Sequence, residues 1–125
     1  MKTVLLVLLG GALGTGLRYF CGLAISYSVR EPRFPWAHLI VNVSGCFAIG
    51  VLAELFEARL QVSSAVRAGL LTGVLGGYTT FSSFGLETYS LLREGHIGLA
   101  TLNVTASVFL GLAAVWLGIR AAHLL

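Results

Sequence analysis

Long apolar stretches separated by short polar segments dominate the pattern along the chain. The apolar stretches cover residues 4–27, 36–56, 65–92 and 97–119 approximately. A helix needs ~20 residues to cross a bilayer, so each stretch is long enough to span a membrane. The pattern therefore predicts an all-α integral membrane protein that forms a single four-span domain over residues 1–125.

The segments between these stretches are short. The first contains the sequence Glu31-Pro32-Arg33-Phe34-Pro35, whose two prolines cannot continue a helix. Polar residues 57–64 make the second connection, and residues 93–96 make the third. Loops of this length leave no room for a soluble catalytic domain, so we expect the function to lie inside the membrane.

Composition supports the same class of protein. Hydrophobic residues make up 57% and charged residues 10% of the 125 residues, with a mean hydropathy of +0.91. Soluble domains average ~45–50% apolar and ~25% charged residues. The formal net charge is +3, but the basic residues are spread singly and form no stripe, so nucleic acid is not an expected partner.

The basic residues are divided almost evenly between the two sides of the membrane. Four spans place Lys2, Arg59, Arg67 and Arg120 on one side and Arg30, Arg33 and Arg93 on the other. Membrane proteins with one fixed orientation usually carry a clear excess of Lys and Arg on the cytoplasmic side. The weak bias is compatible with insertion in both orientations, and so with an antiparallel homodimer.

Glycines recur at helical spacing inside the spans. In the first span, every fourth residue from Gly10 to Gly22 is a glycine, except that Arg18 takes one of these positions. In the third span, the same spacing of four separates Gly69, Gly73 and Gly77. Small residues on one face let membrane helices approach closely. We therefore expect most of these glycines to pack helices together.

Two polar residues inside the first two spans leave alternatives open. Arg18 would cost at least ~2.5–3.5 kcal/mol at the bilayer centre. It either extends to the interface or faces an aqueous vestibule that attracts anions. Asn42 shares one helix face with His38 and Gly45. It either hydrogen-bonds to another helix or lines a pore.

The third span has an unusual centre, Leu-Gly-Gly-Tyr-Thr-Thr-Phe-Ser-Ser-Phe-Gly over residues 75–85. Paired glycines and a run of hydroxyls predict a local break in this helix. Carbonyls freed at such a break suit a cation, while freed N–H groups suit an anion. Phe81 and Phe84 share a face just after the break, either for packing or because their positive ring edges can approach an anion.

Further polar residues extend a line of hydrogen-bonding groups. Glu87 and Thr88 follow in the third span, and Asn103 and Ser107 lie four apart in the fourth. The chain contains no HExxH, GxSxG or phosphate-loop motif. We therefore expect no catalytic residues and no enzyme.

One segment in each of the four spans carries a resemblance to a known family. GGALGTGLRY, HLIVNVSGCFAIG and GVLGGYTTFSSFGLET, together with LNVTASVFLG in the fourth span, resemble the Fluc (CrcB-type) fluoride channels. The resemblance extends through essentially the whole chain. It implies a dual-topology antiparallel homodimer with two pores and a central structural sodium ion held by backbone carbonyls.

The resemblance also implies roles for particular residues. The fluoride pore would contain Asn42, Phe81 and Phe84, and its wall would include Ser83, Glu87, Ser107 and Asn103. Arg18 would lie in the vestibule. The backbone carbonyls of Gly76 and Thr79 would bind Na⁺. Two positions depart from the family pattern. Asn103 stands where some relatives have tyrosine, and Ser83 stands where others have threonine, which preserves the hydroxyl.

The implied function is a fluoride-selective passive ion channel in the bacterial plasma (inner) membrane. It would export fluoride from the cytoplasm to lower the intracellular concentration, with sodium structural and not transported. Two alternatives belong to other classes. A small multidrug-type proton-coupled exporter would need an acidic residue in the first span, which has none and contains Arg18 instead. A structural membrane subunit would conduct no ions.

Overall fold

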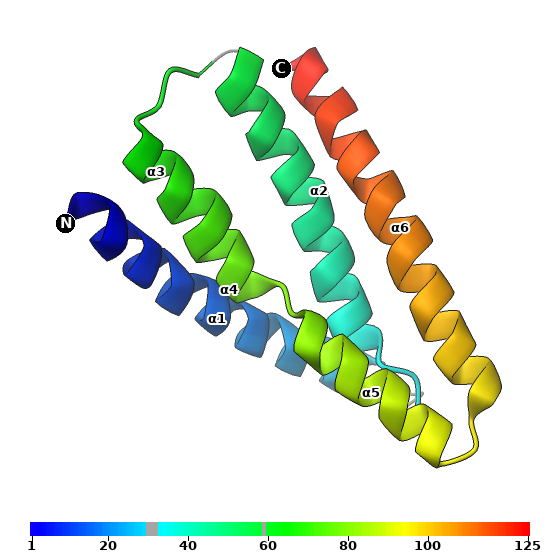
Figure 1. The fold of residues 1–125 in the computed structure, drawn as a ribbon. Coiled ribbons are helices and arrows are strands. Elements are labelled where there is room, and N and C mark those ends of the chain that lie inside the picture. Colours follow the sequence, from blue (N-terminus) through cyan, green and yellow to red (C-terminus); the bar gives the residue numbers. More distant parts are fainter. Residues whose placement is uncertain (30–32, 59) are drawn as a thin grey trace.

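The computed structural model describes residues 1–29, 33–58 and 60–125. Predictions that concern Arg30, Glu31, Pro32 and Arg59 lie outside the described residues. Within the described ranges, all regular secondary structure is helical (Figure 1). The predicted all-α class is confirmed for this part of the chain.

The helices follow the predicted spans closely. They are α1 (Lys2–Ser28), α2 (Trp36–Ala58), α3 (Ser64–Ala68), the π-helix η1 (Gly69–Leu75), α4 (Gly76–Tyr78), α5 (Phe81–Arg93) and α6 (Ile97–Leu124). By length and composition, α1, α2 and α6 can each cross a membrane. The third predicted span is divided into two halves, α3–η1–α4 and α5. The chain is a multi-pass membrane protein.

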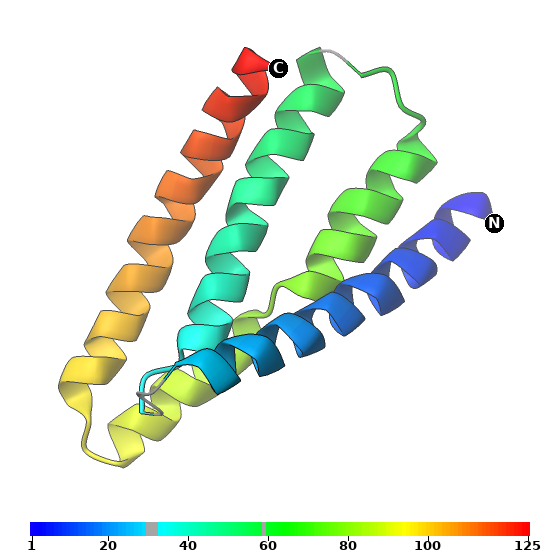
Figure 2. The ribbon, with the colours of Figure 1, turned by 180° about the vertical axis from the view of Figure 1, so that it is seen from behind.

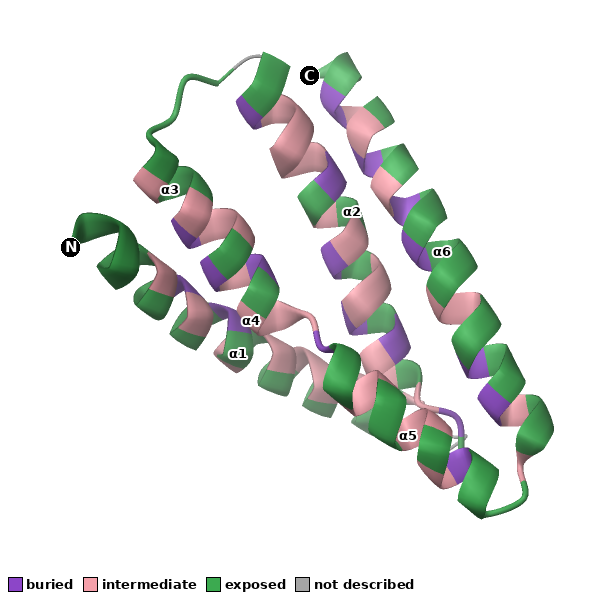
Figure 3. Ribbon diagram, in the orientation of Figure 1, coloured by how far each residue is buried: buried purple, intermediate pink, exposed green. Residues whose placement is uncertain are grey.

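The helices associate mainly as two pairs. α1 packs along the α3–η1–α4 segment, and α2 packs along α6. Figures 1 and 2 show these pairs from opposite sides, with α5 near the ends of α2 and α6. α5 contacts α6 and, to a smaller extent, α2. Figure 3 shows that the buried positions of α6 lie mostly on the side that faces α2, whereas those of α2 occur on more than one side.

Glycines allow α1 to approach the third span. A methyl group on Gly14 would overlap the carbonyl oxygen of Val74, and one on Gly77 would lie 2.6 Å from the carbonyl oxygen of Gly11. Backbone atoms cannot rotate away as a side chain can. The predicted use of glycine for close helix packing is confirmed at these positions.

Glycines also allow α2 and α6 to approach each other closely. A methyl group on Gly50 would overlap the carbonyl oxygen of Val115, and one on Gly118 would overlap that of Phe47. Gly22 is different, because no neighbouring element in the described residues lies within 4 Å of a methyl group placed there. Gly22 therefore takes no part in this close packing.

The break in the third span is present, but it does not lie at the paired glycines. Gly76 and Gly77 remain helical within α4. The chain becomes extended at Thr79 (φ −87°, ψ 157°) and Thr80 (φ −151°, ψ 117°). Gly77 serves the close approach to α1, whereas the threonines lie where side chains offer the backbone other hydrogen-bond partners.

Candidate ion site at the helix break

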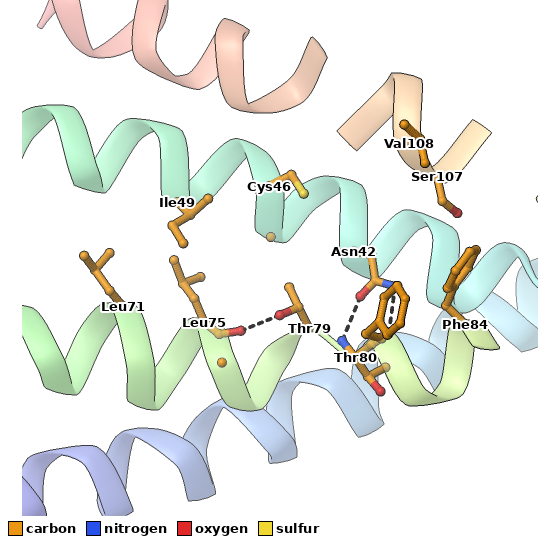
Figure 4. Close-up of a pocket in the computed structure, with 13 residues that line it drawn as sticks. Asn42, Cys46, Ile49, Leu71, Leu75, Thr79, Thr80, Phe84, Ser107 and Val108 are labelled. Carbon is orange, nitrogen blue, oxygen red and sulfur yellow. Dashed lines mark hydrogen bonds between the residues drawn. The ribbon is translucent and has the colours of Figure 1, made fainter. Parts of the chain in front are cut away.

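Asn42 holds the broken backbone in place from the neighbouring helix α2. Its Nδ2 donates to the carbonyl oxygen of Thr80 at 3.1 Å, and its Oδ1 accepts from the Thr80 N–H at 2.8 Å. Figure 4 shows the Asn42 side chain directed at Thr80. Asn42 also lines the adjacent cavity. The sequence left open whether Asn42 hydrogen-bonds to another part of the chain or lines a pore. A residue that bonds to Thr80 and also lines a cavity is compatible with both.

The break removes the usual donors from two carbonyl groups. In a continuous helix, the Thr80 N–H would donate to the Gly76 carbonyl, and the Ser83 N–H would donate to the Thr79 carbonyl. Here the Thr80 N–H donates to Asn42, and the Ser83 N–H donates to Thr80 Oγ1 at 3.3 Å. The carbonyls of Gly76 and Thr79 thus become available to another partner.

A cavity of about 370 Å³ lies beside the break, between α2, η1, α4, α5 and α6. It brings together Asn42, Gly76, Thr79, Phe81, Phe84 and Ser107 from among the residues that the sequence singled out. Figure 4 shows Ser107 on α6 and Phe84 on α5 near Asn42. Residues predicted separately on three spans therefore share one cavity wall.

The two phenylalanines after the break form a tilted pair. Their ring centroids are 5.4 Å apart, with 43° between the ring planes. Phe81 is 83% exposed, while Phe84 is half-buried. The Thr80 side chain caps the N-terminus of α5 and thereby sets where the helix carrying these rings begins. Both rings line the cavity.

Arg18 lies beside a second cavity, of about 410 Å³, which Tyr19, His38 and Ser83 also line. Within the described residues, no salt bridge involves Arg18. The position of Arg18 beside this cavity is compatible with a vestibule, and that role stays a prediction. The Ser83 hydroxyl accepts from Thr80 Oγ1 at 3.1 Å, so this residue belongs to the break as well as to the cavity.

Glu87 has a partner to which sequence reasoning assigned no role. Its Oε1 lies 2.5 Å from Nδ1 of His38, while its Oε2 is buried and makes no hydrogen bond within the described part of the chain. His38 precedes Asn42 by one helical turn. This shared face was visible in the sequence, but the partner 49 residues away was not.

Asn103 is placed apart from the cavity residues. It is 2% exposed, and its Nδ2 donates to Thr88 Oγ1 at 2.9 Å. Thr88 Oγ1 in turn donates to the carbonyl oxygen of Phe84 at 2.7 Å. Asn103 therefore connects α6 to α5 and does not line either of the two cavities described above. Its role at the pore wall stays a prediction.

A multi-pass helical chain with a broken span, a polar clamp and a cavity between its helices has the features of a membrane channel or transporter. The family model described as "CrcB-like protein, Camphor Resistance (CrcB)" matches residues 5–119. The chain belongs to this CrcB family. The family consists of ion channels, not enzymes, which confirms the expectation that the chain is not an enzyme.

Individual relatives match over nearly the whole chain. "Fluoride-specific ion channel FluC" of Solibacter usitatus (strain Ellin6076) is 52% identical over 114 residues, which cover 91% of this chain and 93% of the relative. The protein of the same name from Methylobacillus flagellatus is 46% identical over 119 residues, 94% and 92% of the two chains. That of Agrobacterium fabrum (strain C58) is 45% identical over 119 residues, 95% and 94%. The resemblance found in the sequence is confirmed.

Proposed function

We propose that this chain forms a fluoride-selective passive channel that exports fluoride from the cytoplasm across the bacterial plasma (inner) membrane. The names of the relatives support fluoride as the transported ion. The observation that carries the proposal is the contact between Asn42 and Thr80, which holds a helix break open beside a cavity with two aromatic rings. Such irregular backbone inside a membrane is tolerated where it is buried in protein or lines a cavity.

The groups at the cavity suit a small, strongly hydrated anion. The Asn42 amide has two N–H donors, and only one is used by the Thr80 carbonyl. The remaining donor, the Ser107 hydroxyl and the positive edges of Phe81 and Phe84 would together replace water around fluoride. Ser83 and Glu87 would continue the path, with Arg18 attracting the anion at the vestibule.

Transport in this proposal needs no energy source beyond existing gradients. Hydrogen fluoride enters from acid surroundings and ionises in the cytoplasm. The negative-inside potential then drives the fluoride anion outward, because moving one charge down 100 mV releases ~2.3 kcal/mol. The channel would thereby lower the intracellular fluoride concentration without a nucleotide.

The proposal includes an antiparallel dual-topology homodimer with two pores. Phe81, Leu86 and Tyr89 on α5 are each more than half exposed, so a second copy could cover this helix and complete a pore. Structural sodium, not transported, would be held by the carbonyls of Gly76 and Thr79 from each subunit. These carbonyls fit such an ion because the break has removed their helical donors, and hard cations bind oxygen ligands.

Fluoride efflux from liposomes tests the proposal. Vesicles containing the purified protein are loaded with fluoride or chloride, and valinomycin clamps the potential. We expect rapid release of fluoride but not of chloride. Phe81→Ile should abolish or sharply reduce the release while leaving the dimer intact, because it removes an aromatic edge from the cavity. Phe109→Ile, which changes an exposed ring of α6 outside this cavity, serves as the matched control.

Absence of fluoride release by a folded wild-type dimer would contradict the proposal. It would favour the proton-coupled exporter or the structural subunit. Equal release of fluoride and chloride would retain a channel but remove its selectivity.

A further inference from the structure

His38 and Glu87 form a polar contact that the proposed conduction path does not explain. Nδ1 of His38 lies 2.5 Å from Oε1 of Glu87, and the two side chains are 33% and 30% exposed. His38 lines the cavity that contains Arg18, and it also lines a further cavity of about 280 Å³ that includes Phe34, Trp36 and Glu87. The pair therefore lies between two cavities and not in a closed core.

His38 is one of a small set of titratable or charged side chains in this region. Among the described residues, the titratable or charged side chains that line these two cavities are Arg18, Tyr19, His38 and Glu87. Arginine cannot lose its proton in a protein, and a phenol remains neutral near physiological pH. Histidine is the side chain that changes charge between about pH 5 and 8. His38 is the histidine among these four side chains, and its contact with Glu87 joins any proton that it takes up to the carboxylate.

Protonation changes the sum of charges on the pair. A neutral His38 donates its Nδ1–H to an ionised Glu87, and the pair carries one net negative charge. A protonated His38 makes the same hydrogen bond but brings the sum to zero. An anion that passes Ser83 and the Arg18 cavity meets repulsion in the first state and none in the second. The unpartnered Glu87 Oε2 shows that no second donor within the described residues offsets this carboxylate.

We propose that His38 is a positioning residue that controls conduction through Glu87: a proton taken up by His38 cancels the carboxylate charge beside the path and admits fluoride. Conduction then increases as pH falls. This inference rests on the proposed function, and it names a regulation of the same path. It also matches the chemistry of the ion, because acid surroundings are the condition in which hydrogen fluoride enters a cell.

The test measures fluoride efflux from liposomes at symmetric pH, at about pH 6 and about pH 8. Vesicles with Phe81→Ile protein, measured at each pH, supply the background caused by hydrogen fluoride crossing the lipid. We expect the wild-type protein to conduct roughly three- to ten-fold faster at the lower pH, since one net charge beside the path is removed. His38→Asn retains an N–H donor for Glu87 but cannot titrate, so its flux should be the same at both pH values.

A matched variant separates His38 from other histidines. His96→Asn changes a half-buried histidine in the turn before α6 and should keep the wild-type pH profile. His38→Gln replaces His38→Asn if the latter does not assemble. Wild-type fluoride flux that is independent of pH overturns this inference. So does a His38→Asn variant whose flux keeps the pH dependence. Neither result contradicts the proposed channel function. Absence of wild-type fluoride flux at every pH overturns the proposed function, and this inference with it.

Discussion

The two halves of the third span differ in how they are held. The half before the break packs through glycine against the backbone of α1, with Gly69, Gly73 and Leu75 buried. The half after the break, α5, has only Leu91 buried and exposes rings such as Phe81. One apolar stretch of sequence therefore forms a close-packed segment and an exposed segment.

Polar contacts replace close packing in the second half. Asn42 binds the break from α2, and Asn103 binds Thr88 from α6. Each contact fixes a position along the helix without enclosing it. The difference indicates that the first half is held by close packing, while the second half leaves many of its side chains exposed.

The largest loss of stability should come from Gly77→Ala in the first half of the third span. The added methyl group would lie 2.6 Å from the carbonyl oxygen of Gly11, and backbone cannot rotate away from it. Overpacking of this kind costs about 1–3 kcal/mol and occasionally more. We expect a clear loss of thermal stability in detergent, measured as the fraction that remains soluble and monodisperse after heating.

Gly85→Ala provides the counterpart in the second half. A methyl group at Gly85 meets no atom of a neighbouring element within 4 Å in the described part of the chain. This variant should keep its thermal stability. Equal losses for Gly77→Ala and Gly85→Ala would mean that the two halves are not held differently.

An effect on stability of similar size, but without the tail of larger losses, is expected from Asn42→Asp at the junction of the two halves. The carboxylate can still accept from the Thr80 N–H but cannot donate to the Thr80 carbonyl, so a buried acceptor loses its partner at a cost of about 1–3 kcal/mol. The new negative charge should also block anions. Liposome efflux and thermal stability, measured on the same preparation, would show both losses.

Full fluoride conduction by Asn42→Asp would contradict the pore role of Asn42. In that case the residue would act only as a structural clamp between α2 and the break.

The smallest effect should follow from Asn103→Ala in the contact between α6 and α5. The substitution removes one neutral hydrogen bond, to Thr88 Oγ1, worth about 0.5–1.5 kcal/mol. Thr105→Ala is the control on the same helix, because within the described residues the Thr105 hydroxyl donates to carbonyls of its own helix, those of Thr101 and Leu102. Unfolding in increasing denaturant should separate the two, and a larger loss for Thr105→Ala would reverse this assignment.

Several properties of this protein followed from the sequence alone. The membrane class, the ranges of the long apolar helices and the presence of a break in the third apolar stretch depend on hydrophobicity and on local backbone preference. Both are properties of neighbouring residues, so a single chain displays them directly. The motifs in the four spans, read together, also identified the family.

The tertiary structure decided where the break lies and which side chains meet. Gly77 stays helical because α1 packs against it, and Thr80 leaves the helix where Asn42, 38 residues earlier, offers both a donor and an acceptor. The contact between His38 and Glu87 joins residues 49 apart. Such pairs depend on how each helix is rotated and shifted against its neighbours. Hydrophobic pattern and local preference do not determine that rotation, because in lipid an apolar face can turn toward a neighbouring helix or toward the membrane at similar cost.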